Sequence, residues 1–430
     1  MKLQKLLDNR SVKNAGWIIA GKVIQMLISL LVGLMTARYL GPGNYGLLNY
    51  AAAYIAFFAS LCTLGINSVL VKEFIDHPAQ EGVIIGTSLV LRAVSSILSA
   101  VMVVAIVMIV DAGEKLTHVV VLLTCLGMIF QVYDVFSYWF QSRLESKVAA
   151  TATLVGYIIT STYRIILLAT NKSIEYFAFA TSIDHICVAA LLLWQYRRHS
   201  NERLRFSWAY AKELLQRSCH FILPGIMVSL YSQTDKMMLK QMLTQAEVGY
   251  YATALAICNM WVFILSAIID SAYPPIMEAN KTDEALFKLR NKQLYAITFF
   301  VSLIGATGIC TLSKPIVRIL YGEQFLPAVA PLRVITWYTA FSYLGVARNA
   351  WIVAKNKQKH LLAVYISAAV ANIAVNALLI PIWGAVGAAL ASLIAQIVTT
   401  VIAPFFIKEL KENAVLMFEA IVLKGLVWGK

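Results

Sequence analysis

Apolar runs long enough to cross a lipid bilayer recur along the chain from Gly16 to Phe406, and only short polar segments separate most of them. A bilayer core of about 30 Å requires about 20 consecutive apolar residues in a helix. Apolar residues make up 60% of the 430 residues and charged residues only 13%, too few to cover a soluble surface. The sequence therefore predicts an all-α, polytopic membrane protein.

The spacing of the runs fits about twelve membrane-spanning helices. We expect them near residues 15–37, 47–71, 84–110, 118–141, 149–169, 174–195, 219–240, 248–272, 293–312, 332–354, 361–380 and 384–406. With this count, lysine and arginine gather in alternate connecting segments, as the positive-inside rule requires when both termini are cytoplasmic. The first apolar run is too long for a signal peptide and no cleavage site follows it, which predicts an uncleaved first span.

The longest polar segment, residues 197–218, separates six predicted spans from six. Its mixture of basic and apolar residues is typical of a helix lying on the cytoplasmic membrane surface. The expected parts are an N-terminal six-helix bundle at 1–196, an interfacial linker at 197–218, a C-terminal six-helix bundle at 219–407 and a cytoplasmic interfacial tail at 408–430. Similar loops at 38–46 and 240–251 indicate an internal duplication with parallel repeats.

Five basic side chains fall inside predicted spans, where a charge costs about 2.5 kcal/mol or more unless it faces a cavity or a partner. They are Lys22, Arg92, Arg164, Lys236 and Arg348. Helical spacing places the first four on stripes with serine, threonine, glutamine, tyrosine or glycine. Helix packing explains the small residues of such stripes but not the bases. The pattern predicts a water-filled cavity with net positive charge.

Two carboxylates within the spans, Asp184 and Asp235, are candidates for coupling transport to an ion gradient. His185 either relays protons or is an ordinary hydrogen-bonded interior residue. No Ser-His-Asp order, HExxH, P-loop or GxGxxG occurs in a suitable context, and no Cys/His spacing indicates zinc. We therefore expect no catalytic residue, metal or cofactor. The net charge of +14 is spread over the segments between spans, which argues against nucleic acid as a partner.

Five segments, in order along the chain, resemble the polysaccharide-biosynthesis flippases of the Wzx type, which translocate O-antigen units. They lie at 38–46, 139–147, 235–251, 320–332 and 372–389. The first reads Arg38-Tyr39-Leu40-Gly41, and the last, which is the strongest, contains Asn372, Asn376, Leu379-Ile380-Pro381 and Gly387-Ala388-Ala389. Each match alone is weak, but five in sequence on a twelve-span topology are fairly specific.

The resemblance implies the fold of the multidrug/oligosaccharidyl-lipid/polysaccharide exporter superfamily, with two six-helix bundles (MATE-like) around a central cavity. It implies a bacterial inner-membrane flippase that moves oligosaccharide units of O-antigen, capsule or exopolysaccharide on undecaprenyl pyrophosphate by alternating access. The five basic residues would then bind the pyrophosphate, since an anion in a low-dielectric cavity needs cationic donors. Membrane lipids, a polysaccharide polymerase and a chain-length regulator are the expected partners.

Two other functions remain open at this stage. An ion-coupled multidrug or organic-cation antiporter of the same superfamily would need buried carboxylates, but here intramembrane bases are at least as numerous as acids. A membrane glycan polymerase or ligase would need a large external loop to position its substrates, whereas the longest loop here is predicted to be cytoplasmic. Lipid II flippases follow the same general logic but usually carry extra C-terminal spans.

Overall fold

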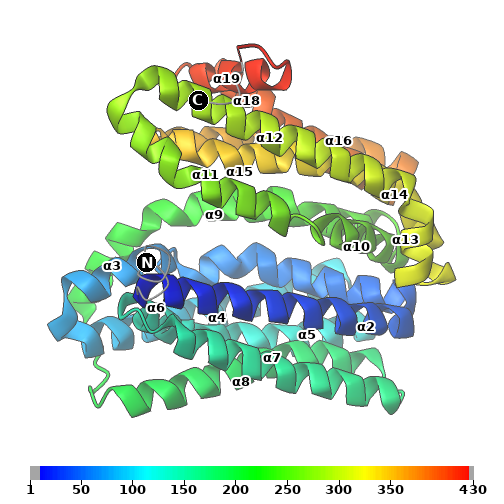
Figure 1. Ribbon diagram of the computed structural model, residues 1–430. Helices are drawn as coiled ribbons and strands as arrows, with labels where there is room; N and C mark the ends of the chain where they lie inside the picture. The colour runs from blue at the N-terminus through cyan, green and yellow to red at the C-terminus, as the bar shows by residue number, and fades with distance from the viewer. Residues whose placement is uncertain (1–9, 426–430) are drawn as a thin grey trace. The chain divides into compact units, whose positions relative to one another are not determined.

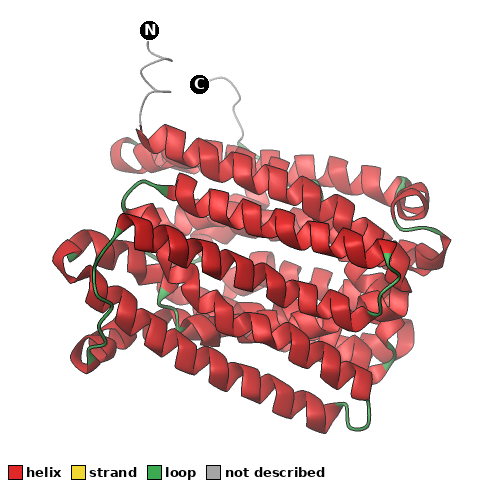
Figure 2. Cartoon of the chain, turned by 90° about the horizontal axis from the view of Figure 1, so that it is seen from below, coloured by secondary structure: helices red, strands yellow, loops and turns green. Residues whose placement is uncertain are grey.

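The computed structural model describes the backbone of residues 10–425 and the side chains from Ile24 onward, and every regular element in that range is a helix (Figures 1 and 2). The α-helices are α2 (Arg10–Thr63), α3 (Asn67–Asp76), α4 (Glu81–Val110), α5 (Lys115–Phe130), α6 (Val135–Ser142), α7 (Ser146–Ala169), α8 (Ile174–His199), α9 (Trp208–Met242), α10 (Gln245–Asn259), α11 (Phe263–Thr282), α12 (Glu284–Thr311), α13 (Ser313–Leu320), α14 (Val329–Ile335), α15 (Tyr338–Ala354), α16 (Leu361–Trp383), α17 (Ala385–Ile397), α18 (Ala403–Phe406) and α19 (Lys411–Ile421). Short 3-10 or π segments are η1 (Pro78–Gln80), η2 (Gln131–Asp134), η3 (Glu323–Ala328), η4 (Gln358–His360) and η5 (Val398–Ile402).

In this described range, eight helical segments are long and apolar enough to cross a membrane, and the bent pair α10–α11 makes a ninth if it is one span. One segment, Ile24–Asp76, has 53 residues, which at 1.5 Å per residue is enough for two crossings. It contains the break at Gly41, where φ is 70° and ψ is 172°. The prediction of a polytopic helical membrane protein is confirmed, and the count of twelve spans stays a prediction.

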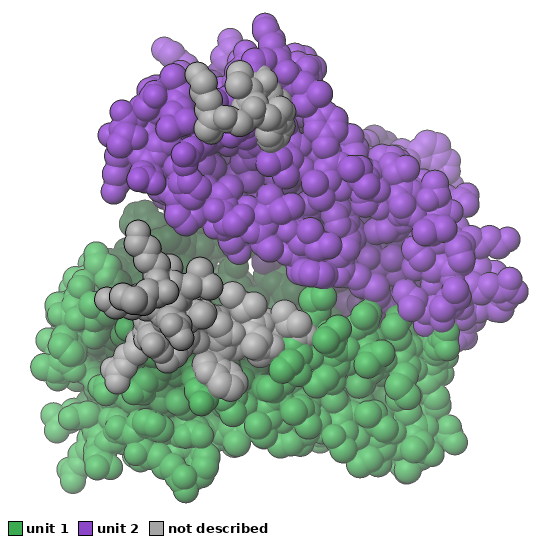
Figure 3. Space-filling view, viewed as in Figure 1, with its two compact units in different colours: residues 1–40, 51–226 green, residues 41–50, 227–430 purple. Residues whose placement is uncertain are grey.

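The chain forms two compact units, shown in Figure 3. Unit 1 comprises Met1–Leu40 and Ala51–Ile226, and unit 2 comprises Gly41–Tyr50 and Met227–Lys430. Each has its own apolar core of buried aromatic and aliphatic side chains, around Trp139 in unit 1 and around Trp351 in unit 2. Helix α9 contains both the second half of the predicted linker and the predicted seventh span.

The first half of the predicted linker, residues 200–207, has no regular structure and lies against the start of α4. The Arg205 backbone N–H donates to the carbonyl oxygen of Gly82 at 3.0 Å. A Cβ on Gly82 would lie 2.4 Å from the Arg203 carbonyl oxygen, and one on Gly86 would lie 2.5 Å from that of Arg205. Glycine at these two positions therefore lets the backbone of the linker approach the helix closely.

A buried carboxylate fixes the start of α9 to α3. Glu73 accepts hydrogen bonds from the Tyr210 hydroxyl at 2.9 Å and from Arg217 Nη1 at 2.5 Å. Burial, reinforced by Glu73, raises the pKa of Tyr210, so its hydroxyl remains a donor. The hydrogen bond to Glu73 raises the pKa of Arg217. Trp208, by contrast, is 76% exposed, as a residue at a membrane surface would be.

The two loops that indicated a duplication meet inside unit 2. A Cβ on Gly46 would lie 1.8 Å from the carbonyl oxygen of Gln245, and a Cβ on Gly249 would lie 2.1 Å from the carbonyl oxygen of Pro42. The contact is reciprocal, because each glycine lies against the residue four positions before the other glycine. Only residues without a side chain permit this distance between two backbones.

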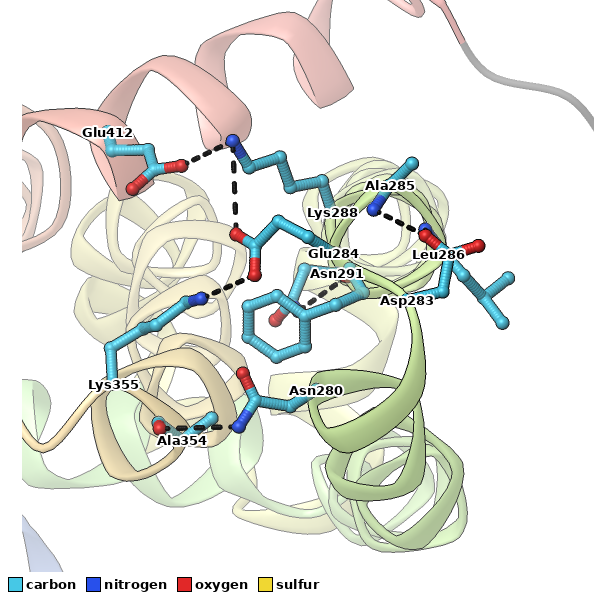
Figure 4. A network of polar contacts seen from close by, with 11 residues as sticks. Asn280, Asp283, Glu284, Ala285, Leu286, Lys288, Asn291, Ala354, Lys355 and Glu412 are labelled. Carbon is cyan, nitrogen blue, oxygen red and sulfur yellow. Dashed lines mark hydrogen bonds and ion pairs between the residues drawn. The ribbon is translucent and has the colours of Figure 1, made fainter.

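The C-terminal helix α19 packs on α12. Figure 4 shows Lys288 of α12 paired with Glu412 of α19 at 2.7 Å, and Lys355 paired with Glu284 at 2.7 Å. Next to these surface pairs, Asn413 Nδ2 donates to the Tyr295 hydroxyl at 2.6 Å in the core. The tail is therefore a docked helix, although its outer face still carries exposed apolar side chains such as that of Phe418.

Candidate functional site

A buried carboxylate organises four helices of unit 2. Asp235 of α9 is 1% exposed. Its Oδ1 accepts hydrogen bonds from Nδ2 of Asn372 at 2.9 Å and of Asn376 at 2.5 Å, both on α16. Its Oδ2 accepts from the Tyr251 hydroxyl of α10 at 2.6 Å and from the Ser392 hydroxyl of α17. Such a carboxylate is tolerated in a membrane protein because every lone-pair direction meets a donor.

The local sequence explains how these donors converge. Asn372 and Asn376 are four residues apart and therefore lie on the same face of α16. Asn376 Nδ2 also donates to Asn372 Oδ1 at 3.1 Å, which orients both amides. Among the described residues, Asn376 Oδ1 is buried and has no hydrogen-bond donor. Buried acceptors without a partner are uncommon, so this oxygen is an exception within an otherwise satisfied network.

A cavity of about 200 Å³ opens beside this network. All of its lining residues belong to unit 2. They are Tyr231, Ser232, Gln233, Asp235, Tyr251, Leu255, Asn259, Tyr338, Ser392, Ala395 and Gln396. The cavity is polar and aromatic, and its one acidic group already has four donors.

Two of the predicted cavity bases are buried among helices. Arg92 of α4 is 1% exposed and Arg348 of α15 is 2% exposed. Arg92 Nη2 donates to the Gln131 carbonyl oxygen in the 3-10 turn η2 at 2.9 Å, and Arg348 Nη1 donates to that of Thr399 in the π turn η5 at 2.8 Å. Each arginine thus binds a backbone carbonyl at a helix irregularity, where the regular pattern of hydrogen bonds is interrupted.

These arginines keep unused donors. Nε and Nη1 of Arg92, and Nε of Arg348, are buried without a hydrogen-bond acceptor in the described part of the chain. Buried guanidinium N–H groups without acceptors cost free energy in this state. An anion bound in another state of the protein would satisfy them.

The other predicted charges are less enclosed. Lys236 of α9 is partly exposed, and its Nζ donates to Gln233 Oε1 at 3.3 Å. Arg164 of α7 is partly exposed and interacts electrostatically with Asp184 of α8. Asp184 Oδ1 also accepts from the Thr160 hydroxyl at 3.4 Å.

His185 is hydrogen-bonded through Nε2 to the Gln131 amide nitrogen at 3.1 Å, which fits the ordinary interior role as well as a relay. The remaining predicted base, Lys22, lies outside the residues whose side chains are described.

The predicted site residues fall into two groups. Unit 1 holds Arg92, Arg164 and Asp184, of which Arg164 and Asp184 interact. Unit 2 holds Lys236, Arg348 and Asp235, of which Lys236 follows Asp235 directly along α9. Whether these charges line one cavity stays a prediction. In the described residues, no group of three or more histidine, cysteine or acidic side chains is placed to hold a metal ion.

Sequence reasoning did not anticipate Tyr251, Ser392, Tyr231 and Tyr338 as neighbours of Asp235. Tyr251 was visible only as part of a family-like segment, and Ser392 only as a small residue in an apolar helix. A single sequence does not specify which faces of α9, α10, α16 and α17 pack together, so no pattern in it could have linked these residues.

The architecture is that of a polytopic helical membrane protein with a MATE-like fold. A lipid II flippase MurJ in an inward closed conformation superimposes with a TM-score of 0.73, at 14% identity over 96% of this chain and 93% of that one. A multidrug resistance MATE family transporter of the MOP superfamily, in its inward-facing conformation, gives 0.67 at 13% identity, over 94% and 99% of the two chains. At these identities the likeness concerns the fold alone.

The chain belongs to the family of polysaccharide biosynthesis proteins, whose model matches residues 11–281. It is 23% identical to a probable low-salt glycan biosynthesis flippase, Agl15, of Haloferax volcanii, over 49% of this chain and 45% of that protein. It is 21% identical to an uncharacterized membrane protein in the cps region of Klebsiella pneumoniae, over 93% of this chain and 83% of that protein. The chain thus spans less than half of the first relative and most of the second.

Proposed function

We propose that this protein is a flippase that moves oligosaccharide units linked to undecaprenyl pyrophosphate across the bacterial inner membrane by alternating access, and that it catalyses no covalent reaction. The product would enter O-antigen, capsule or exopolysaccharide synthesis, where a polymerase and a chain-length regulator are the expected partners. Both termini would be cytoplasmic. The membership of the polysaccharide biosynthesis family supports this proposal.

The observation that carries the proposal is the set of basic side chains within apolar helices. Arg164 and Lys236 are partly exposed inside the spans, and Arg92 and Arg348 keep buried donors without acceptors. A pyrophosphate is the part of the carrier lipid that most resists entry into a membrane. Charge-assisted hydrogen bonds from lysine and arginine compensate for its lost hydration.

Asp235 is the proposed ion-coupling residue, and Asp184 is the second candidate. An ion bound at Asp235 would change the hydrogen bonds that join α9 to α10, α16 and α17. Binding of an ion at one side of the membrane would thereby bias which arrangement of these helices is populated.

Expression of this chain in a bacterium that lacks its own flippase is expected to restore glycan on the cell surface. Arg164→Ala and Lys236→Ala should each reduce that display about ten- to hundredfold, because each removes charge-assisted hydrogen bonds worth about 1.5–3 kcal/mol. Display is measured with a glycan-binding lectin on intact cells, normalised to the amount of protein in the membrane. The matched control is Lys314→Ala, which removes an exposed basic side chain of α13.

Each result separates one part of the proposal from the others. If the wild-type chain restores display and both variants equal it, the function stands and the assignment of Arg164 and Lys236 is wrong. If the wild type restores no display with several glycans but lowers the accumulation of cationic drugs, the antiporter is the correct function.

A further inference from the structure

The cavity of about 200 Å³ in unit 2 has a lining that ion coupling does not require. Away from Asp235, its walls are formed by the aromatic rings of Tyr231 and Tyr338 and by the side-chain amides of Gln233, Asn259 and Gln396. Both tyrosines are partly exposed and line the cavity. Aromatic faces next to a few fixed polar groups are the usual composition of a small-molecule site.

We propose that this cavity is a subsite for one sugar ring of the transported glycan, which stacks on Tyr231 and hydrogen-bonds to Gln233 and Gln396. The proposal rests on the proposed function for the identity of the ligand, but binding of a sugar here can be measured without any transport. The proposed subsite gives the uncharged residues of the cavity a role in binding the sugar, whereas the basic residues are proposed to bind only the pyrophosphate.

The aromatic surface suits the apolar face of a pyranose. Tyr231 of α9 packs beside Tyr365 of α16, with ring centroids 6.4 Å apart and planes tilted by 31°. The faces of these rings carry partial negative charge, and a pyranose has one face of C–H groups with partial positive charge. Such a face can lie on a tyrosine ring and bury apolar surface while its hydroxyl groups point sideways.

The polar groups of the lining match hydroxyl groups better than phosphate. A side-chain amide offers both donors and an acceptor, and a sugar hydroxyl is likewise both, whereas a phosphate oxygen only accepts. Gln396 is already held by a hydrogen bond to the Tyr338 hydroxyl at 3.4 Å, and Gln233 by its bond from Lys236 at 3.3 Å. These bonds orient the amides and leave further donor and acceptor positions for a ligand.

The charges around the cavity argue against an organic cation, the other ligand that aromatic rings attract. Arg348 interacts electrostatically with the Tyr231 and Tyr365 hydroxyls, and Lys236 is bonded to a lining residue. The one carboxylate, Asp235, already accepts four hydrogen bonds. The only carboxylate of the lining is therefore occupied by its own donors, and Lys236 and Arg348 add positive charge nearby, which disfavours an organic cation relative to a neutral sugar.

The size of the cavity limits the ligand to one ring. Sites for drug-sized molecules have volumes of about 300–1,000 Å³. At about 200 Å³ this cavity is smaller, so it cannot enclose an oligosaccharide repeat unit. It would hold one sugar of the unit and could discriminate between sugars by the positions of their hydroxyl groups.

Saturation-transfer NMR on the full chain in lipid nanodiscs tests the subsite. The probes are free glucose, galactose, mannose, rhamnose and N-acetylglucosamine, each at millimolar concentration. At least one sugar is expected to receive saturation from the wild type. Tyr231→Leu, which keeps apolar volume but removes the ring, should lower that signal about fivefold or more, the factor expected for one aromatic contact.

Two controls distinguish loss of the ring from damage to the fold. Tyr231→Phe keeps the ring and should retain most of the signal, and Tyr273→Leu removes an exposed tyrosine of α11 outside the cavity and should retain all of it. Each variant must elute as a single species in size-exclusion chromatography. If Tyr231→Leu does not fold, Tyr338→Leu, at the other aromatic wall of the cavity, takes its place with the same expected loss.

The proposal is overturned if none of the five sugars receives saturation, or if removal of the ring leaves the signal unchanged. It is also overturned if tetraphenylphosphonium binds and competes with every sugar that does, because the cavity would then be a cation site. Glycan display separates the two proposals. If the chain binds sugar through Tyr231 but restores no display, the subsite proposal stands and the flippase proposal is wrong. If the chain restores display but binds no sugar through Tyr231, only the flippase proposal stands.

Discussion

Asp235→Asn is expected to fold and reach the membrane but to lose glycan translocation almost completely, whereas Asp235→Ala is expected to be unstable. Asparagine has nearly the same shape as aspartate, and the hydroxyl groups of Tyr251 and Ser392 can rotate so that they accept rather than donate. Alanine removes the acceptor of four buried hydrogen bonds, and each donor that finds no other acceptor costs about 1–3 kcal/mol. The measurements are glycan display and thermal stability in detergent.

The same pair of proteins identifies the coupling ion. An ion that binds only the folded state raises stability by about 2.7 kcal/mol at a hundredfold excess over its Kd. Wild-type stability should therefore rise with the concentration of the coupling cation, for example Na⁺, and Asp235→Asn should show no such rise. If Asp235→Asn restores display as well as the wild type, Asp235 has no part in coupling. Asp184→Asn then becomes the variant to measure.

Gly46→Ala and Gly249→Ala are each expected to prevent accumulation of folded protein. A Cβ at Gly46 would lie 1.8 Å from the Gln245 carbonyl oxygen and 2.7 Å from the Gly249 backbone nitrogen, distances at which the backbones must separate. Overpacking costs about 1–3 kcal/mol when side chains can adjust, and the cost is larger here because the obstructing atoms belong to the backbone. The amount of monodisperse protein after membrane extraction is the measurement.

Gly43→Ala is the matched control, three residues from Gly46 on the same helix. A Cβ at Gly43 would have no atom within 4 Å, so alanine should be tolerated there. Its higher helix propensity should raise the free energy of unfolding by about 0.5–1 kcal/mol. Equal yields from Gly46→Ala and Gly43→Ala would show that the segments do not pack in this way.

Much of the fold followed from the sequence, because the bilayer imposes strong rules on a membrane chain. Every backbone N–H and C=O group must be satisfied within the spans, so apolar runs of span length had to be helices. The join between the first two predicted spans was harder to foresee. Two helices meet directly at the break at Gly41, so no extended loop separates them where the sequence had indicated one. The sequence also did not reveal that a helix starting at Trp208, within the predicted linker, continues directly into the next apolar run.

The candidate site could be predicted only in part. Charge inside an apolar run is visible in any sequence, which is why Asp235 and Arg348 could be named. Their surroundings were not visible, since four donors from three other helices surround the carboxylate. Arg348 is buried with a backbone carbonyl of a π turn as its partner, and its place at a cavity stays a prediction. Neither hydropathy nor helical periodicity indicates where such a turn will form.

The reciprocal contact of Gly46 and Gly249 has a consequence for the origin of the chain. Pro42 and Gln245 are 203 positions apart, as are Gly46 and Gly249, so the two contacts join corresponding positions of the two segments, as contacts related by a two-fold axis would. An interface of this symmetry is the kind that two identical subunits make when they associate as a homodimer. A half-length ancestor that paired with a copy of itself through this glycine would already have possessed the contact. Fusion of the two genes would then have made permanent an association that had depended on concentration.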